Sequence, residues 1–223
     1  MQIEVVVARY CENISWVGNL PRGVRATVYD KGGSGTGHTL PNIGREAHTY
    51  FFHIVQHYEN LAPVTVFVQG HPFDHAPDLH KLVRGWNGAS ELEHGFFWLG
   101  FILDTDTADG GRLFRAWSKN LDGRGLDMKS LFSEVFGVEE APDVYRFKPG
   151  GQFAASADVI RQRPREFYEK CLEQSVAFPD AAHCFERLWD RVFCAPPIGD
   201  EEMCGDLTRY LKKVKRLETP LLA

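Results

Sequence analysis

The chain has 223 residues, 43% of them hydrophobic and 13% aromatic, which suits one sizeable folded domain and excludes an intrinsically disordered chain. Its formal net charge of −5 and pI near 6.0 argue against a nucleic-acid scaffold. Five cysteines form no Cys-x-x-Cys pair, and their odd number suits free thiols in a reducing compartment. From the acidic charge we expect no nucleic-acid partner. No secretory leader or membrane span is evident, so we expect a soluble, cytoplasmic domain.

The first part of the chain predicts strands that alternate with short connections. Ile3–Ala8 predicts a first strand, a short helix capped by Asn13 or Ser15 follows, and Val24–Tyr29 predicts a second strand. The glycine-rich run at 32–37 lacks the Gly-Lys-Ser/Thr ending of a P-loop. We therefore interpret this run as a flexible connector rather than a phosphate cradle.

An amphipathic helix is predicted from Ile43 to Tyr58, with Asn42 as its N-cap. Its first turn would favour an anion, and Gly44 would let a ligand approach closely. His53 and His57 are one turn apart and could share a metal, but a solvated polar border is the favoured reading. The predicted buried face consists of Ala47, Tyr50, Phe51, Ile54 and Tyr58.

A buried strand at Val64–Val68 ends in a dense polar cluster. In open α/β sheets, ligands bind just beyond the carboxyl ends of the strands, so this junction is the best site candidate. The cluster contains Gln69, His71, Asp74 and His75.

A second candidate site is acidic. A short helix is expected from Asp78 to Arg84, followed by a buried strand at Gly95–Leu103 that stops at Asp104 and Asp106. Two carboxylates at the end of a strand could hold a divalent ion against a diphosphate, but a solvated turn is the favoured reading.

The last third of the chain carries further polar candidates. A helix is expected at 127–136, Gly150 and Gly151 precede a polar Gln152, and a helix should begin at Pro164. The three arginines around this proline could bind phosphate, although an exposed basic helix start is the commoner outcome. They are Arg161, Arg163 and Arg165.

A helix that begins at Pro179 carries the candidate general base. Glu186 lies at the margin of its apolar face, where burial would raise the pKa of the carboxyl; the alternative is a surface ion pair with Arg187 or another arginine. Residues 200–216 predict a lysine-rich helix in a tail that packs on the domain. The apolar face consists of Ala181, Phe185, Leu188, Trp189 and Val192.

Several blocks together resemble the uncharacterised family called domain of unknown function 3431, over almost the whole chain up to about Phe193. The blocks are Val7-Ala8-Arg9-Tyr10 with Glu12 and Trp16, Val28-Tyr29-Asp30-Lys31-Gly32, Asn42-Ile43-Gly44-Arg45-Glu46, Gln69-Gly70-His71-Pro72-Phe73-Asp74, Gly150-Gly151-Gln152-Phe153 and Glu186-Arg187-Leu188-Trp189. More loosely, this family is similar to glycosyltransferases of the GT-A fold. The resemblance implies a single α/β domain over residues 1–195 with a mixed, mostly parallel sheet flanked by helices, and a helical tail at 196–223.

The same resemblance implies a nucleotide-sugar donor, a glycan or small hydroxyl acceptor and a Mn²⁺ or Mg²⁺ ion, with inversion at the anomeric carbon. The chain departs from the usual pattern after the central strand, where Gln69-Gly70-His71 stands in place of Asp-x-Asp. His71 and Asp74 are therefore the first choice for the metal, and Asp104 and Asp106 the second.

The remaining roles are hypotheses. Glu186 is the expected base, and Gln69, His71, Gln152 and Arg187 are expected to bind the substrate. Two alternatives stay open: a zinc hydrolase built on His71, Asp74 and His75, with His53 or His57, and an inactive glycan-binding module. The residues expected to hold the nucleotide or donor are Arg9, Tyr10, Asn42, Arg45 and Glu46.

Overall fold

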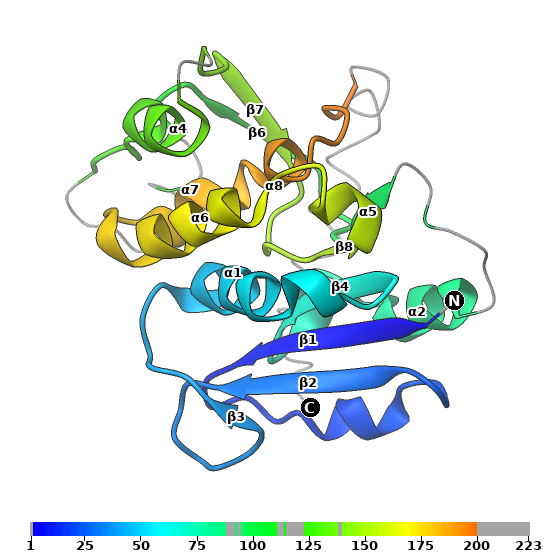
Figure 1. Ribbon diagram of the computed structural model, residues 1–223. Coiled ribbons are helices and arrows are strands. Elements are labelled where there is room, and N and C mark those ends of the chain that lie inside the picture. Colours follow the sequence, from blue (N-terminus) through cyan, green and yellow to red (C-terminus); the bar gives the residue numbers. More distant parts are fainter. Residues whose placement is uncertain are drawn as a thin grey trace, which may run out of the picture.

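A six-stranded mixed sheet forms the centre of the molecule (Figure 1). The structure, a computed structural model, describes residues 2–87, 92, 95–110, 114, 123–137 and 140–199. The strand order is β3-β2-β1-β4-β8-β5, and only β8 runs antiparallel to its neighbours. This confirms the predicted single α/β domain with a mostly parallel sheet. The strands are β1 (Ile3–Arg9), β2 (Arg25–Asp30), β3 (His38–Thr39), β4 (Val64–Gln69), β5 (Phe96–Trp98) and β8 (Phe153–Ser156).

The central strands β1 and β4 are buried on both faces, which explains why they read as continuous apolar runs. Val6 and Phe67 face the large core beneath α1, whereas Val5, Val7 and Val66 face a smaller core beneath α2. Figure 1 shows α1 between the sheet and α6. The helices are η1 (Ser15–Asn19), α1 (Arg45–His57), η2 (Tyr58–Asn60), η3 (Pro72–Asp74), α2 (Leu79–Trp86), α4 (Met128–Phe136), α5 (Ala157–Ile160), α6 (Arg165–Ala177), α7 (Ala181–Glu186) and α8 (Trp189–Val192).

A second, two-stranded sheet corrects the expectation for the acidic segment. The predicted strand at Gly95–Leu103 is limited to Phe96–Trp98. Asp104–Thr107 forms its own strand, β6, which pairs antiparallel with β7 (Val144–Phe147), so the solvated-turn reading was wrong. The sequence of this segment resembles a turn because the strand is only four residues long and polar. Its pairing partner lies some forty residues later in the chain, so the local sequence does not reveal it.

The start of α1 also differs from the prediction. Gly44, not Asn42, precedes the helix, and both Gly44 (φ 58°) and Arg45 (φ 49°) have positive φ. A Cβ on Gly44 would lie 2.6 Å from the Ser175 carbonyl oxygen, so the helix begins where α1 meets α6. Asn42 remains exposed ahead of the helix.

The helix predicted from Pro179 is broken. Asp180 has a positive φ of 54°, α7 ends at Glu186, and α8 begins at Trp189. The break turns the Arg187 side chain into the protein, where it is 2% exposed. The predicted apolar face of this segment is buried throughout.

His53 is a fourth correction, because it is fully buried instead of lying on a solvated border. Its Nδ1 lies 3.1 Å from the Tyr29 hydroxyl and its Nε2 lies 3.8 Å from a Glu4 carboxylate oxygen. Glu4 also accepts hydrogen bonds from Arg25 and Thr27. Glu4, an acidic residue within the apolar strand β1, thus supplies a polar partner for His53 of α1. The sequence pattern of the helix alone does not reveal this partner.

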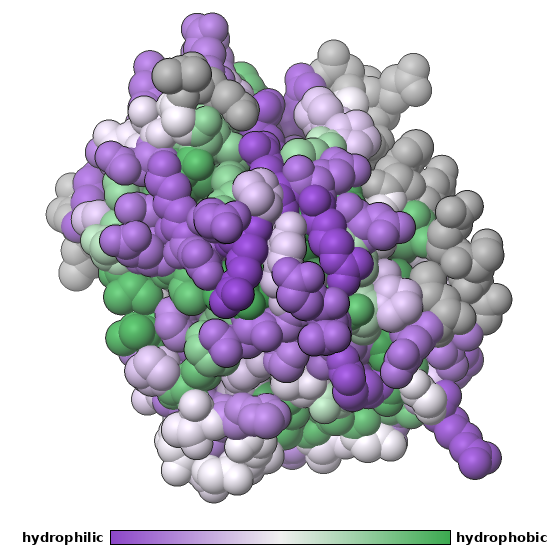
Figure 2. Space-filling view, viewed as in Figure 1, coloured by the Kyte–Doolittle hydropathy of each residue, from purple (hydrophilic) through white to green (hydrophobic). Residues whose placement is uncertain are grey.

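Hydrophilic residues cover much of the face in Figure 2, and hydrophobic ones emerge only in separate patches. Within the described ranges, no helix is long and apolar enough to cross a membrane. Four cysteines of the described part, at 11, 171, 184 and 194, are free thiols. The predicted tail helix at 200–216 lies outside the described residues.

Candidate functional site

A cleft of about 470 Å³ lies where the connections of the sheet change direction. From β1 the chain moves outward to β2 and β3, and α1 then returns it to β4 on the other side of β1. The connections that leave the carboxyl ends of the neighbouring strands β1 and β4 therefore run in opposite directions, and ligands bind at such a point in open α/β sheets. The lining residues are Ala8, Arg9, Tyr10, Glu12, Lys31, Asn42, Arg45, Glu46, Gln69, His71 and Asp74.

The predicted donor-side residues come together in this cleft. Arg9 ends β1 and Tyr10 follows it, Arg45 and Glu46 open α1, and Gln69 ends β4. Tyr10 is 51% exposed at the cleft, which leaves its ring available for stacking. The end of β1, the start of α1 and the end of β4 thus line the same cleft, although they are far apart in the sequence.

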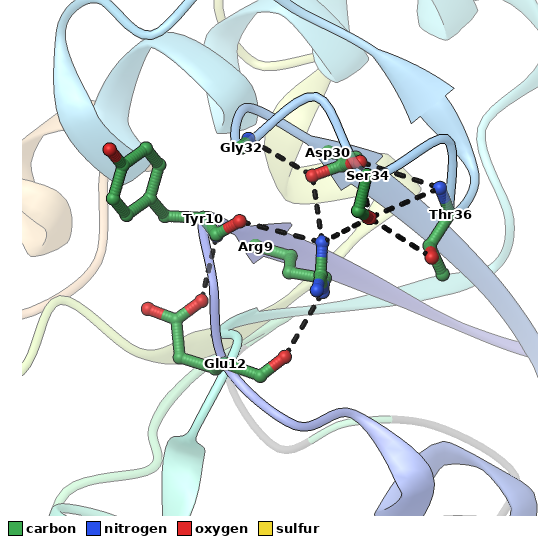
Figure 3. Close-up of polar contacts among 7 residues, drawn as sticks. All are labelled: Arg9, Tyr10, Glu12, Asp30, Gly32, Ser34 and Thr36. Carbon is green, nitrogen blue, oxygen red and sulfur yellow. Dashed lines mark hydrogen bonds and ion pairs between the residues drawn. The ribbon is translucent and has the colours of Figure 1, made fainter.

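Asp30 organises the wall beside β2 (Figure 3). Its buried carboxylate accepts hydrogen bonds from Ser34 Oγ at 2.7 Å, from the Gly32 amide at 3.0 Å and from Arg9 Nη1 at 2.8 Å. The hydrogen bond from Ser34, with those from backbone amides, holds the pKa of Asp30 down to about 2. The glycine-rich run is therefore a connector that wraps a carboxylate, and Arg9 is engaged in holding it.

Lys31 is a buried cation in the same wall. Its ammonium donates to the Ile43 carbonyl oxygen at 2.5 Å and to the Arg45 carbonyl oxygen, so it ties the end of β2 to the start of α1. Burial lowers the pKa of Lys31 to about 8, and the neighbouring Glu46 opposes this shift. Lys31 and Arg45 together give the cleft two cations near the helix start.

Glu12 supports the other end of the cleft floor. Its carboxylate accepts the Tyr10 amide at 2.7 Å, and a Cβ on Gly70 would come within 2.5 Å of the same carboxylate oxygen. The Trp16 indole donates to the Gly70 carbonyl oxygen at 2.9 Å. These contacts fix the loops after β1 and β4 against each other.

The predicted metal ligands lie at the rim. His71 Nε2 is 3.5 Å from Asp74 Oδ1, with side chains 53% and 76% exposed. Across the described ranges, no group of three or more His, Cys, Asp or Glu side chains is arranged to hold a metal ion. The pair supplies two donors, so a hexacoordinate cation would need further oxygens from phosphate or water.

Asp106, one of the two second-choice metal residues, forms a buried ion pair. Asp106 is 2% exposed, and its Oδ2 accepts from Arg187 Nε at 2.9 Å and from Nη2 at 2.8 Å. Arg187 Nη1 also donates to the His183 carbonyl oxygen, at 2.5 Å. Arg187, predicted to orient an acceptor, is therefore part of a buried ion pair and does not line the cleft.

Glu186 is held by the loop between β7 and β8. Its Oε1 accepts the Gly150 amide at 2.6 Å, and its Oε2 lies 3.6 Å from Arg187 Nη1. Burial raises the pKa of the Glu186 carboxyl, opposed chiefly by Arg187. The predicted marginal position is confirmed, but Glu186 is not among the cleft-lining residues.

Close approach requires a glycine at 150, whereas at 151 a positive φ of 59° favours one. A Cβ on Gly150 (φ 106°) would lie 2.4 Å from His75 Cγ. A Cβ on Gly151 would lie 3.6 Å from both Glu46 Oε1 and Trp189 Nε1. The loop therefore runs between the polar cluster after β4 and the carboxyl groups of Glu46 and Glu186.

Gln152 is 1% exposed, and its Nε2 donates to the Pro72 carbonyl oxygen at 3.1 Å. It braces the loop after β4 rather than lining the cleft. The three arginines around Pro164 point to separate partners: Arg161 to the carbonyls of 58 and 59, Arg163 to that of 191 and Arg165 to Glu169. They form no common phosphate site.

Asp30, Lys31 and Glu12 were missed as site residues by reasoning from the pattern. Asp30 ends β2, the neighbour of β1, and Lys31 follows it, so the rule that placed the site at strand ends also applies to them. Glu12 carries no such signal, because its role depends on a turn after β1.

Comparison with known families agrees with the motif-based resemblance. A family model described as Protein of unknown function (DUF3431) matches residues 5–207. No curated protein and no solved structure matches the chain.

Proposed function

We propose that this chain, which belongs to the family Protein of unknown function (DUF3431), is a nucleotide-sugar-dependent glycosyltransferase of GT-A type. The observation that carries the proposal is the position of the cleft at the carboxyl ends of β1 and β4, where the connections of the sheet leave in opposite directions. Its volume of about 470 Å³ falls in the usual range for small-ligand sites.

The lining chemistry supports an anionic donor. Lys31 and Arg45 stand on one side of the cleft, where they would offset negative charge on a diphosphate leaving group. The Tyr10 ring would stack on the base or the sugar of the donor, and the Asn42 side-chain amide would donate a hydrogen bond to the same donor. His71 and Asp74 would hold a divalent cation, whose chemistry would be to neutralise the same diphosphate.

Transfer further requires a base for the acceptor hydroxyl. As the acceptor oxygen bonds to the anomeric carbon, its proton passes to a carboxylate, and the electron pair of the broken C–O bond leaves on the diphosphate. Attack opposite the leaving group would give inversion. Two half-buried carboxyl groups are candidates: Glu46, which lines the cleft, and Glu186, which lies behind the glycine loop at 150 and 151.

Incubation with a panel of nucleotide sugars and Mn²⁺, followed by measurement of released nucleoside diphosphate, tests the proposal. We expect release with at least one donor, and faster release when hydroxyl acceptors are added. Arg45→Ala should weaken nucleotide binding, whereas Arg84→Ala, at an exposed position of α2, should not. Neither binding nor release with any donor would overturn the proposed function.

A further inference from the structure

The two carboxyl groups beside the cleft differ in what surrounds them. Glu46 lines the cleft, with its side chain 14% exposed. Its nearest charged neighbour on α1 is Arg45, whose Nε lies 3.7 Å from Oε2. Glu186 does not line the cleft, and both of its carboxylate oxygens face protein groups, the Gly150 amide and the Arg187 guanidinium.

We infer that Glu46, rather than Glu186, takes the proton from the acceptor hydroxyl, and that Glu186 is a positioning residue that holds Gly150 and Gly151 against it. This inference rests on the proposed transferase function. A base must reach the proton it abstracts, and of the two carboxyl groups only Glu46 lines the cleft in the part of the chain that the structure describes.

The position of the glycine loop links the two groups. Gly150 donates its amide to Glu186, and the Cα of the next residue faces Glu46, since a Cβ there would lie 3.6 Å from Oε1. Glu186 therefore sets how closely the loop approaches Glu46. Trp189 Nε1 would lie at the same 3.6 Å from that Cβ, so an indole also borders this space.

The electrostatics suit a base. Burial raises the pKa of the Glu46 carboxyl and the negative charge of Glu186 adds to the rise, while Arg45 and Lys31 oppose it. A raised pKa makes a carboxylate a stronger base, and the two cations limit the rise. In the forward step Glu46 gains the acceptor proton, which it then releases to water after the diphosphate departs.

Two isosteric variants decide the assignment. We expect Glu46→Gln to lower kcat by about 10²–10⁴-fold while the Kd for the nucleoside diphosphate changes less than about threefold, because the base acts only during transfer. The acidic limb of the pH–kcat profile should disappear. Glu186→Gln should keep that limb and lose less than about tenfold in kcat, because the amide oxygen of Gln can still accept from Gly150.

Glu134→Gln, at an exposed position of α4, is the matched control and should behave as the wild type. Thermal unfolding of each variant shows that the fold is intact, and Glu46→Asp should recover part of kcat if the carboxylate itself is needed. If Glu46→Gln transferred sugar with the wild-type kcat and kept the acidic limb of its pH–kcat profile, this inference alone would be overturned. Absence of transfer by the wild type would overturn the proposed function and this assignment together.

Discussion

Arg9 Nη1 lies 2.8 Å from Asp30 Oδ1, so an ion pair joins the carboxyl ends of two neighbouring parallel strands beside the cleft. The same guanidinium donates to Ser34 Oγ at 2.7 Å. Asp30 therefore holds both a strand end and the glycine-rich connector, and its charge is the centre of this wall.

Removal of the Asp30 charge should loosen the glycine-rich connector at 32–37. Asp30→Asn keeps the shape of the side chain but removes the charge that Arg9 pairs with, so we expect cleavage within 32–37 in limited proteolysis to become several-fold faster. Asp78→Asn, at an exposed position before α2, should leave it unchanged. The pKa of Asp30 is lowered to about 2, so the charged interaction persists above pH 4 and is lost only as pH falls through about 2. Equal cleavage rates for both variants would contradict this role.

Lys31 should make ligand binding depend on pH. Burial lowers its pKa to about 8, so the ammonium is charged at pH 7 and mostly neutral at pH 9.5. A charge-assisted hydrogen bond contributes about 1.5–3 kcal/mol, so we expect the Kd for uridine diphosphate to rise about tenfold or more over that interval. Calorimetric titration at both pH values measures the change. Lys31→Met should remove it, and Lys81→Met, an exposed residue of α2, should retain it.

His53 should make stability depend on pH in mildly acidic solution. Burial lowers its pKa from 6.5 to about 4, with Glu4 opposing. The unfolded chain therefore binds more protons between these values, so the free energy of unfolding falls as pH drops from about 6.5 to 4, by an amount on the order of 3 kcal/mol. Urea unfolding at pH 7 and pH 4.5 tests this, and His53→Phe should show a smaller decrease than the wild type. Identical decreases in both proteins would contradict it.

The buried Arg187–Asp106 pair should matter far more than an exposed one. Arg187→Met leaves the Asp106 carboxylate buried without its guanidinium, which should lower the free energy of unfolding by about 3–5 kcal/mol. Arg165→Met breaks the exposed pair with Glu169 and should cost less than about 1 kcal/mol. Urea unfolding compares them. Adding Asp106→Asn to Arg187→Met should recover part of the loss, and no recovery would argue against the pairing as the cause.

Gly150 should tolerate no side chain. Both Gly150 (φ 106°) and Gly137 (φ 80°) have positive φ, but only at Gly150 would a Cβ meet another residue, His75, at 2.4 Å. We expect Gly150→Ala to lower the free energy of unfolding by about 1–3 kcal/mol more than Gly137→Ala, because overpacking adds to backbone strain. It should also lower kcat by displacing the loop from Glu46. Equal losses at the two positions would contradict the close approach.

The strand ends that line the cleft were predictable because their signal is local. Apolar runs ending at Arg9 and Gln69 identify parallel strands, and parallel strands bring their carboxyl ends to one edge of a sheet. The Asn-x-Gly-Arg-Glu block likewise identified the start of α1, although Gly44 rather than Asn42 precedes the helix.

Partners that meet only through tertiary structure could not be predicted in this way. Asp106 and Arg187 are 81 residues apart, and nothing in either local pattern identifies the other. Glu186 was correctly expected at the edge of a core, but its bond to the Gly150 amide depends on how the β7–β8 loop packs. The burial of His53 depends on Glu4, a residue whose side chain an apolar strand pattern ignores.

The order β4-β8-β5 has a consequence for how the chain folds as it is synthesised. β5 leaves the ribosome long before Phe153–Ser156, the strand that must lie between it and β4. Until that strand arrives, the apolar edge of β4 lacks its neighbour and can pair with another chain. A nascent chain stalled before residue 153 should therefore aggregate. Once residues up to 156 have left the ribosome, β8 can insert between β4 and β5 and complete the sheet.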